Sequence, residues 1–441
     1  MSQLNHFGAK GDGKADDTAA IQHFIEQCDG HVALPRGDYR ITKPLEIDLS
    51  RLGRTAISGA GGIASLIMDG PGPAIRLIGT HAGSADPDSF KPGVWAMERM
   101  PTVSAIEIVG AHDEADGIEL TGTMQPTLSG VFIRQCRYGV HLVKRNRNVL
   151  IADSHIYHGR GPAIGIYFDG VNLHQTNIVG CHISYCRHAG IKIQRSEIRN
   201  LQITGCDIEY NFDETAPDSA DVWIDAREST VREGTIASCT IQAKRSPGGA
   251  NVRIEGSDDA ASRKAGLWTI AGNVIQSQET NLLLRSCRGV VVTGNSFCSG
   301  YERNIVIEKC RNIVVGSNTL DYNPDYKGDR VDGITVRGSS GINLSGLIVE
   351  SARAGTAESG GAIEVFDSSE IAIANCQVFD PVHRGLHLDG VRNAQVSNCA
   401  VLCRQPQATM REAVLLRRTS RDVLLPGNLL ARGTAGDVTI Q

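Results

Sequence analysis

The sequence predicts an all-β protein, a single-stranded parallel β-helix of about 12 to 13 coils. A short apolar strand that ends in a small polar residue recurs along the chain, as at residues 202–206, 269–273 and 291–295. Successive copies lie roughly 22 to 34 residues apart, and self-similarity at such a period indicates a solenoid. A repeat built of short strands without a helix fits a parallel β-helix.

Each repeat contains three short strands. The first ends at the small polar residue, the second follows directly, as at residues 181–183 and 295–297, and the third comes after a loop of variable length. Side chains alternate between the two faces of a strand, so every second residue of a third strand points outward. We expect third strands at residues 165–168, 190–193, 221–224, 251–254, 281–284 and 304–307.

The small polar residue predicts an internal ladder. Equivalent residues of successive coils stack about 4.8 Å apart. Asn can form hydrogen bonds along such a stack, and Cys is small and apolar enough to fill the same position. The predicted ladder consists of Asp153, Cys181, Cys206, Cys239, Asn273, Asn295, Asn318, Leu347, Cys376, Cys399 and Asn428.

The same register explains the 12 cysteines of the chain. Five of them lie on the ladder, and two further pairs, Cys136 with Cys186 and Cys287 with Cys310, share positions beside third strands. We therefore expect reduced packing cysteines rather than a disulfide framework. The chain has no CxxC pair and no zinc-type His spacing, so no metal site is predicted. A reducing compartment is the simplest location for such thiols.

Composition narrows the function classes. The chain has 441 residues and a net charge of −5, and this mild acidity argues against a nucleic-acid groove. The apolar runs are only strand-sized, so no membrane span is predicted. No basic segment followed by an apolar one opens the chain, so no signal peptide is visible. Solenoids exceed ordinary domain sizes, and we expect one β-helix domain over residues 49–441.

Residues 1–48 are expected to form an N-terminal cap. Ile21, Phe24, Ile25 and Cys28 lie at helical spacing and predict an amphipathic helix over residues 16–28. Asp16 or Asp17 is a natural N-cap for it. Such a helix would cover the open end of the solenoid core.

The opening residues also carry a family resemblance. The run from His6 to Gln22, followed by a helix and then by residues 32–41, resembles the N-terminal signature of the pectate-lyase-like superfamily of right-handed β-helices. That superfamily includes polygalacturonases, tailspike-type depolymerases and related carbohydrate enzymes. The resemblance implies a right-handed β-helix with carbohydrate chemistry in a long groove. It covers about the first 45 residues by motif and the rest by the repeat alone.

The outward residues of the third strands form two parallel files that suit a sugar. Carboxylates bond hydroxyls, cations neutralise acidic substituents, and aromatic rings stack on pyranose faces. His188 lies in the turn that leads to Lys192, within reach of the same face. We expect Asp225, Glu255, Asp169, Asp221 and Lys192 to be catalytic, and Tyr167, Trp223, Arg253, His188 and His141 to bind substrate.

Carboxylate spacing favours a glycoside hydrolase or a related glycosyl-transferring enzyme. Asp225 and Glu255 occupy equivalent positions on adjacent coils, so their backbones are expected about 5 Å apart. Asp169 lies two coils from Asp225, which places the two backbones about 10 Å apart. Retaining glycosidases need about 5 Å between carboxylates and inverting ones roughly 6.5 to 9.5 Å. Asp225 would be the nucleophile or base, and Glu255 or Asp169 the acid. No cofactor is needed for this chemistry.

Two alternatives remain open. A polysaccharide lyase would use Lys192 as base and Arg253 on the uronate, with Asp169, Asp225 and Glu255 on calcium. A non-catalytic glycan-binding solenoid would use the same face only for binding. If these residues have no catalytic role, Lys192 simply forms ion pairs with Asp169 and Asp225 in a solvent-exposed stack of charged side chains.

Departures from the relatives prevent a transfer of catalytic residues. The polygalacturonase motifs are not present in order. Trp223-Ile224-Asp225 is similar to a Trp-Ile-Asp motif of pectate lyases, but Ala226 stands where that motif continues with His.

The expected partner is a poly- or oligosaccharide, with neither nucleic acid nor membrane, and a homotrimer is a plausible assembly. The long excursion at residues 80–103, with Phe90 and Trp95, is expected to pack near the groove or to meet a partner subunit.

Overall fold

The computed structural model describes residues 3–83, 86–258, 264–326, 328–405 and 410–441. The chain forms two compact units. Unit 1 comprises Met1–Asp213, Asp221–Asp225 and Ser229–Glu233, and unit 2 comprises Glu214–Ala220, Ala226–Glu228 and Gly234–Gln441. The division predicted from the sequence, a cap over residues 1–48 and one solenoid domain over residues 49–441, stays a prediction.

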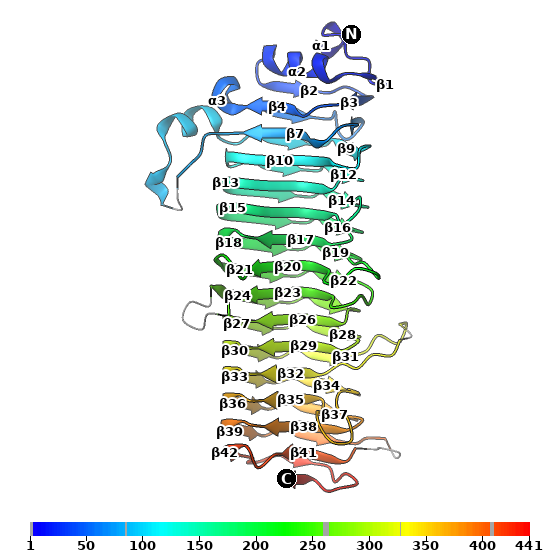
Figure 1. Cartoon of the computed structure of the whole chain (residues 1–441), viewed down its shortest axis with the longest axis vertical. Coiled ribbons are helices and arrows are strands. Elements are labelled where there is room, and N and C mark those ends of the chain that lie inside the picture. The colour runs from blue at the N-terminus through cyan, green and yellow to red at the C-terminus, as the bar shows by residue number, and fades with distance from the viewer. Residues whose placement is uncertain (1–2, 84–85, 259–263, 327, 406–409) are drawn as a thin grey trace. The chain divides into compact units, whose positions relative to one another are not determined.

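In unit 1, short parallel strands stack one turn above another to form a first sheet, sheet A (Figure 1). Apart from β1 (Asp12–Asp16), which has no buried residue, each strand has a buried apolar residue that points into the core, such as Ile133, Ile156 and Ile183. The unit 1 strands of sheet A are, in order, β1 (Asp12–Asp16), β3 (Gly37–Ile41), β6 (Ala64–Met68), β9 (Glu107–Gly110), β12 (Phe132–Arg134), β14 (His155–Tyr157), β16 (His182–Ser184) and β19 (Asp207–Glu209).

Longer strands form sheet B, which contains the predicted first and third strands of each coil. In β13 and β15 the third strand of one coil runs through a bend into the first strand of the next. The strands of sheet B that lie wholly or partly in unit 1 are β2 (His31–Ala33), β4 (Leu45–Asp48), β5 (Ala56–Ser58), β7 (Gly72–Ile78), β8 (Thr102–Ser104), β10 (Ala115–Met124), β11 (Thr127–Ser129), β13 (Tyr138–Ala152), β15 (Ile164–Val179), β17 (Ala189–Gln194), β18 (Glu197–Thr204), β20 (Ala220–Ala226) and β21 (Val231–Ala237).

Unit 2 repeats the same plan. Its sheet A strands are β22 (Thr240–Gln242), β25 (Val274–Gln276), β28 (Ser296–Cys298), β31 (Thr319–Asp321), β34 (Ile348–Glu350), β37 (Gln377–Phe379), β40 (Ala400–Leu402) and β43 (Leu429–Leu430). Its sheet B strands are β23 (Ala250–Gly256), β24 (Ala265–Ala271), β26 (Thr280–Arg285), β27 (Cys287–Thr293), β29 (Arg303–Glu308), β30 (Arg311–Gly316), β32 (Ile334–Arg337), β33 (Ser340–Ser345), β35 (Ile363–Phe366), β36 (Ser369–Ala374), β38 (Arg384–Asp389), β39 (Arg392–Ser397), β41 (Glu412–Leu416), β42 (Arg421–Leu424) and β44 (Val438–Ile440).

These strands confirm the predicted all-β parallel solenoid. The predicted third strands coincide with β15, β17, β20, β23, β26 and β29. The chain makes about 15 turns, slightly more than the 12 to 13 expected. The additional turns include those near the N-terminus, where β1, β3 and β6 stack without the clear polar ending of the later repeats.

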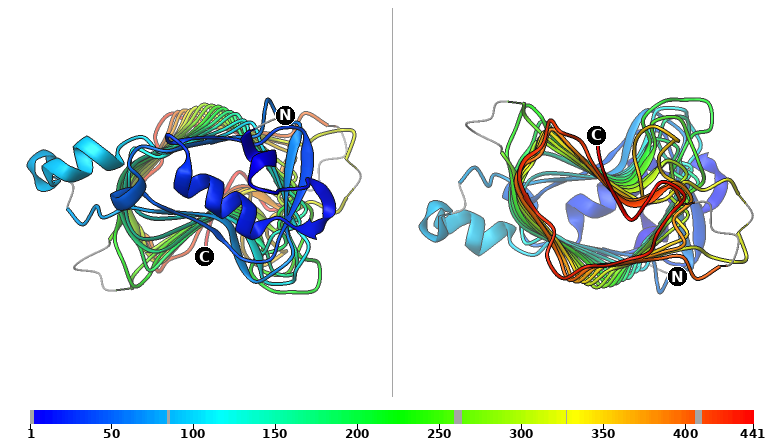
Figure 2. Two further views of the ribbon diagram at one scale, coloured as in Figure 1. Left: turned by 90° about the horizontal axis from the view of Figure 1, so that it is seen from above. Right: turned by 90° about the horizontal axis from the view of Figure 1, so that it is seen from below.

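The predicted N-terminal helix is present as α2 (Thr18–Gln27). Its apolar stripe is buried at Ile21, Phe24 and Ile25, as expected, with the shorter helix α1 (Gln3–His6) beside it. Seen end-on, α1 and α2 lie across the end of the unit 1 strands (Figure 2). The helix therefore covers core residues that would otherwise meet water.

The polar ladder is confirmed in unit 2. Asn273 donates through Nδ2 to Asn295 Oδ1 at 2.9 Å, and Asn295 donates in the same way to Asn318 Oδ1 at 2.9 Å. Each amide also bonds the backbone of the adjacent turn, so its buried polar atoms are satisfied. Cys239 N donates to Asn273 Oδ1 at 2.9 Å, which extends the ladder by a cysteine.

The ladder prediction was wrong at one position. Asp153 does not lie on it, because the register pairs His155 with His182 and so places Ser154 beside Cys181. Ser154 is buried, and its Oγ accepts from Val131 N and donates to Ala152 O. Asp153 is the exposed corner residue before it, at φ 49, where other turns often carry glycine.

All twelve cysteines are free, as expected. Nine of them are buried in ladders and beside strands. Burial raises the pKa of the Cys136 and Cys186 thiols to about 12, so these groups stay protonated. They act as small packing residues.

The excursion at residues 80–103 contains η1 (Pro87–Ser89) and η2 (Val94–Glu98) and extends outward beside α3 (Leu49–Leu52) (Figure 1). It is fastened to the solenoid at its base. Arg147 Nη1 of β13 donates to Asp86 O at 3.0 Å, and within the excursion Thr80 N donates to Glu98 Oε2 at 2.6 Å, which joins its two ends. Trp95 is exposed on it.

We predict that Asn295→Ala destabilises the protein by about 3 kcal/mol, because it leaves several buried donors and acceptors of the adjacent turns without partners. Asn343→Ala is the matched control, since Asn343 points to solvent from β33, and we expect a change within about 0.5 kcal/mol. Denaturant unfolding followed by circular dichroism measures both. Equal effects of the two substitutions would contradict a stabilising role for the ladder.

Candidate functional site

One file of side chains runs along the outer face of sheet B in unit 1. Register pairs Glu46 with Arg76, Arg76 with Glu119, Glu119 with His141, His141 with Tyr167, and Tyr167 with Lys192. The file begins as alternating charges, because Arg76 pairs with Glu46 at 2.9 Å and with Glu119 at 2.8 Å. It then changes to imidazole, phenol and ammonium groups, which can transfer protons or bind anions.

The first cluster of the site is built on β13 and β15 around Asp169. His141 Nε2 lies 3.3 Å from Asp169 Oδ2, and Arg195 Nη2 donates to Asp169 Oδ1. The His141 ring is stacked on the Tyr167 ring, with centroids 5.4 Å apart and planes at 5°. Tyr167 OH donates to Gln194 Oε1 at 3.1 Å and accepts from Arg195 Nη2 at 3.4 Å.

This arrangement sets the charge of the cluster. The hydrogen bond from His141 and the Arg195 guanidinium hold the pKa of the Asp169 carboxyl below its usual range. Burial, together with the nearby Asp169 carboxylate, raises the pKa of Tyr167 to about 12. Asp169 is therefore an ionised orienting group at neutral pH, and Tyr167 is a neutral phenol that can donate a proton.

The second cluster lies on β17 and β20. Lys192 Nζ is 2.7 Å from His188 Nε2 and 4.1 Å from the centroid of the Trp223 ring. His188 itself contacts Trp223, with ring centroids 5.3 Å apart. The sequence placed these three residues on one face, and the structure brings them into contact. Lys192 and Trp223 are 7% and 6% exposed, so the indole ring mainly positions the ammonium group, which can pair with a carboxylate.

Two predicted carboxylates of β20 differ in their surroundings. Asp221 is 0% exposed, and its Oδ1 accepts from Asn211 N at 3.2 Å and from Asn211 Nδ2 at 3.0 Å. These contacts give Asp221 a role in holding the loop that precedes β20. Asp225 stands on the outer side of the same strand, two residues beyond Trp223, and is buried. Their predicted catalytic roles stay predictions.

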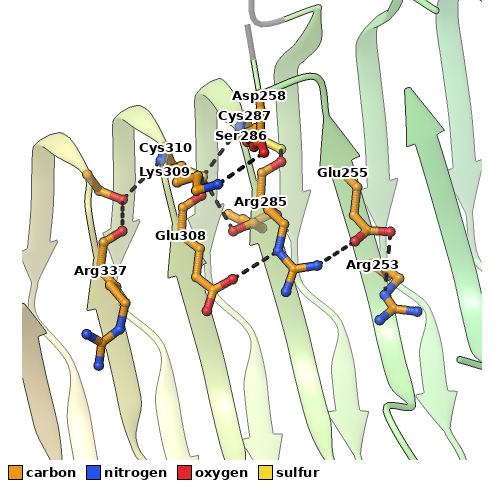
Figure 3. Close-up of polar contacts among 12 residues, drawn as sticks. Arg253, Glu255, Asp258, Arg285, Ser286, Cys287, Glu308, Lys309, Cys310 and Arg337 are labelled. Atoms are coloured by element: carbon orange, nitrogen blue, oxygen red, sulfur yellow. Dashed lines mark hydrogen bonds and ion pairs between the residues drawn. The ribbon is translucent and has the colours of Figure 1, made fainter. Parts of the chain in front are cut away.

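The two predicted residues of unit 2 form part of a charge ladder (Figure 3). Glu255 pairs with Arg285 at 2.8 Å and lies 3.7 Å from Arg253, and Arg285 pairs in turn with Glu308 at 2.9 Å. Arg253 also donates to Asp218 Oδ1 at 3.0 Å. Glu255 is thus a carboxylate held between two guanidinium groups. Its predicted role as an acid is untested.

Sequence reasoning missed Arg195 and Tyr138. Arg195 follows β17 at φ 52, so strand alternation does not give the direction of its side chain. Tyr138 begins β13, and its ring lies 4.9 Å from His141 and 5.1 Å from Tyr167. Both residues could have been found from their sequence positions, because each lies next to a third strand, where a corner residue can reach the outer face.

A hollow of about 740 Å³ lies at the N-terminal end of the same face. It is bordered by α2 together with β4 and β7, and Gln22, Glu46 and Arg76 are among its lining residues. Glu46 and Arg76 therefore belong both to the hollow and to the outward file. The predicted catalytic and binding residues lie further along the face.

Over the ranges given above, no group of three or more His, Cys, Asp or Glu side chains is placed to hold a metal ion. In the same ranges, each helix is too short or too polar to cross a membrane.

We predict that Asp169→Asn destabilises the protein by about 1 kcal/mol at pH 7, because the partly exposed pairs with His141 and Arg195 are lost. The pKa of Asp169 is lowered in the folded state, so its contribution is present above the unfolded-state pKa of about 3.9 and is lost as pH falls through the folded-state pKa. The difference between wild type and variant should therefore shrink below about pH 4. Asp153→Asn, at an exposed corner, is the control and should show no such pH dependence. Thermal midpoints between pH 3 and 7 measure both, and a constant difference for Asp169→Asn would contradict the assigned pairing.

Two family models match the chain. The model described as "Right handed beta helix region" matches residues 102–236 and 220–401. The model described as "Rhamnogalacturonase A/epimerase, pectate lyase-like" matches residues 3–71, which confirms the resemblance seen in the opening residues. No curated protein matches the chain.

Solved structures with a similar fold include phage and bacterial proteins. The N-terminal fragment of gene product 12 of bacteriophage Phi29 has a TM-score of 0.50 at 13% identity, over 98% of this chain and 72% of that chain. The Dettilon tailspike protein has a TM-score of 0.44 at 13% identity, over 98% and 67%. The A-module of the Azotobacter vinelandii mannuronan C-5 epimerase AlgE6 has a TM-score of 0.38 at 14% identity, over 97% and 98%. The right-handed model spans residues 102–401, more than half of the chain, and the chain therefore belongs to the right-handed β-helix family.

Proposed function

We propose that the protein is a carbohydrate-active enzyme that binds an acidic polysaccharide along the outer face of sheet B in unit 1 and cleaves it by β-elimination. The observation that carries this proposal is the Asp169–His141 pair beside the stacked Tyr167 ring. It joins an oriented imidazole, a neutral phenol and nearby cations on one face. These are the groups that proton transfer next to a uronate carboxylate requires.

His141 is the proposed general base. Its Nε2 faces the Asp169 carboxylate, which fixes the orientation of the ring and favours a proton on that nitrogen. The other ring nitrogen, Nδ1, then has a lone pair that can accept a proton. The base would remove the proton from the ring carbon next to the uronate carboxylate. The same Asp–His arrangement orients bases in other enzymes.

Tyr167 is the proposed general acid. Its pKa of about 12 keeps the phenol protonated at neutral pH. As the bond between the adjacent ring carbon and the glycosidic oxygen breaks, a ring double bond forms and the leaving oxygen needs a proton. Tyr167 would supply that proton, and Arg195, within 3.4 Å of the phenol oxygen, would stabilise the phenolate that results.

Lys192 and Trp223 are the proposed substrate-binding residues. An ammonium group beside the uronate carboxylate neutralises it and makes the neighbouring proton more acidic. The Trp223 ring is 6% exposed and its centroid lies 4.1 Å from the Lys192 ammonium, so it would position that group and add a small apolar contact. Both residues are held in place by His188, which contacts each of them.

A glycoside hydrolase is the second candidate, and one observation favours it. Asp169 and Asp225 lie on the same outward file of unit 1, two strand spacings or about 9.5 Å apart, near the separation that inverting enzymes use. Asp169, ionised at neutral pH, would be the base and Asp225 the acid. Glu255 is less suited to the acid role, because its carboxylate is engaged by guanidinium groups on both sides.

The first test is turnover of a glycan panel, with ultraviolet absorbance and product mass recorded together, in the presence and absence of a calcium chelator. We expect acidic polymers such as polygalacturonate or alginate to give products with a new absorbing double bond and no added water. Products that gain water without new absorbance would replace the lyase with the hydrolase. Binding without turnover on every polymer would leave a glycan-binding solenoid.

We expect His141→Gln to lower kcat by about 10²- to 10⁴-fold, the usual contribution of a general base. Tyr167→Phe should lower kcat in the same way, whereas Lys192→Met should mainly raise KM. His31→Gln, at an exposed position of β2, is the matched control and should leave the rate unchanged. Steady-state kinetics on the best polymer distinguish these effects. Full activity of both His141→Gln and Tyr167→Phe would exclude the proposed acid–base pair.

A further inference from the structure

A second group of aromatic side chains lies on the other sheet of unit 1. His158, Tyr185 and Tyr210 directly follow β14, β16 and β19, so they occupy the same corner of three successive turns. Their rings are stacked. The centroids of His158 and Tyr185 are 4.7 Å apart with planes at 6°, and those of Tyr185 and Tyr210 are 5.7 Å apart with planes at 7°. We call these three residues the corner stack.

The backbone at this corner makes the aromatic residues unusual. His158, Tyr185 and Tyr210 have φ values of 49, 61 and 56. Left-handed backbone is uncommon for residues other than glycine and is an outlier for bulky ones, so it is often associated with function. Four corners of unit 2 with the same left-handed backbone carry a small polar residue instead, Ser277, Ser299, Ser351 and Asp380, so this backbone does not require an aromatic side chain.

The corner stack borders a hollow of about 320 Å³. Gly159, Phe212 and the exposed Arg187 form the rest of its wall, and the Phe212 ring lies 6.4 Å from that of Tyr210 at 54°. Tyr185 is 45% exposed, so an aromatic edge faces solvent there. A hollow of this size lies at the lower end of the range for small-ligand sites.

A polar strip adjoins the corner stack. Tyr157 OH forms a hydrogen bond with His182 Nδ1, and His182 Nε2 lies 3.9 Å from Glu209 Oε2. The Tyr157 ring is 6.0 Å from that of His158 and 6.5 Å from that of Tyr185. The strip therefore places donors and acceptors for hydroxyl groups next to the aromatic rings.

We propose that the corner stack is a second glycan-binding site that takes a sugar residue bearing a carboxylate. The rings of Tyr185 and Phe212 would contact the C–H surface of a pyranose, and the phenol and imidazole edges would bond its hydroxyls. Arg187 would pair with the carboxylate through its planar fork. This site lies on sheet A and shares no residue with the catalytic face on sheet B. It rests on the proposed function only for the choice of an acidic sugar.

The test uses serine, because serine is the residue that equivalent corners tolerate. Tyr185→Ser, Tyr210→Ser and Arg187→Gln are compared with wild type by affinity electrophoresis in gels containing sodium polygalacturonate, sodium alginate or neutral dextran. Tyr322→Ser is the matched control, since Tyr322 directly follows β31, is 47% exposed and has serine at the corners of the adjacent turns. Circular dichroism and thermal midpoints establish that each variant is folded.

We expect an acidic polymer to retard the wild-type protein, and each corner-stack variant to raise the apparent Kd about tenfold, as loss of a central aromatic or arginine contact does. Tyr322→Ser should bind as wild type does. Unchanged retardation of the two tyrosine variants, an equal loss in Tyr322→Ser, equal retardation by dextran, or no retardation of wild type by any polymer would each overturn the inference.

Binding and turnover are measured separately, so the two proposals fail independently. Double-bond formation by a protein whose binding is insensitive to Tyr185→Ser and Tyr210→Ser would overturn the second site and leave the lyase. Loss of binding in these variants, with no turnover by wild type, would retain the second site and remove the lyase.

Discussion

The structure depends on the fixed spacing of parallel strands. Each turn forms its hydrogen bonds with the turns beside it, about 4.8 Å away, so a residue meets its own counterparts along the solenoid. A buried amide such as Asn295 is stable only because the neighbouring turns present Asn273 and Asn318 at the same position. A single asparagine in an otherwise apolar core would leave donors and acceptors unpaired.

The same spacing organises the outer surfaces. On sheet B of unit 2 it places Arg285 between Glu255 and Glu308, which turns three charges into a continuous ion-paired row. On sheet B of unit 1 it stacks the rings of His141 and Tyr167, and on sheet A it stacks the corner rings. Equivalent positions of successive turns have the same backbone spacing. The residue types at these positions therefore decide what each surface of the solenoid can bind or catalyse.

Much of the fold could be predicted because its determinants are local. The strand that ends in a small polar residue and the helical spacing of Ile21, Phe24 and Ile25 are both visible within short windows. The ladder prediction failed at Asp153, the corner residue that directly precedes Ser154, because Ser154 is the residue that lies beside Cys181. The alternation rule correctly placed His141, Tyr167 and Lys192 on one outer face.

The rest of the site could not be predicted, because it depends on contacts between turns. The backbone at Arg195 is left-handed, so the in–out alternation of strand residues does not predict where its side chain points. The cover that His188 and Trp223 give to Lys192 depends on the path of the loops before their strands. The same is true of Asp221, whose partner Asn211 lies on the far side of such a loop.

The amide ladder also has a consequence for how such a chain can change in length. Asn273 and Asn295 occupy one position of successive turns, 22 residues apart in the sequence. Removing or duplicating one such segment would bring another amide or thiol of the same row into the vacated place, with the strand register intact. In most globular proteins the loss of 22 residues destroys the core. Here evolution can lengthen or shorten the chain by one turn at a time. The distance between two surface sites can therefore change by whole turns while the residues that form each site stay the same.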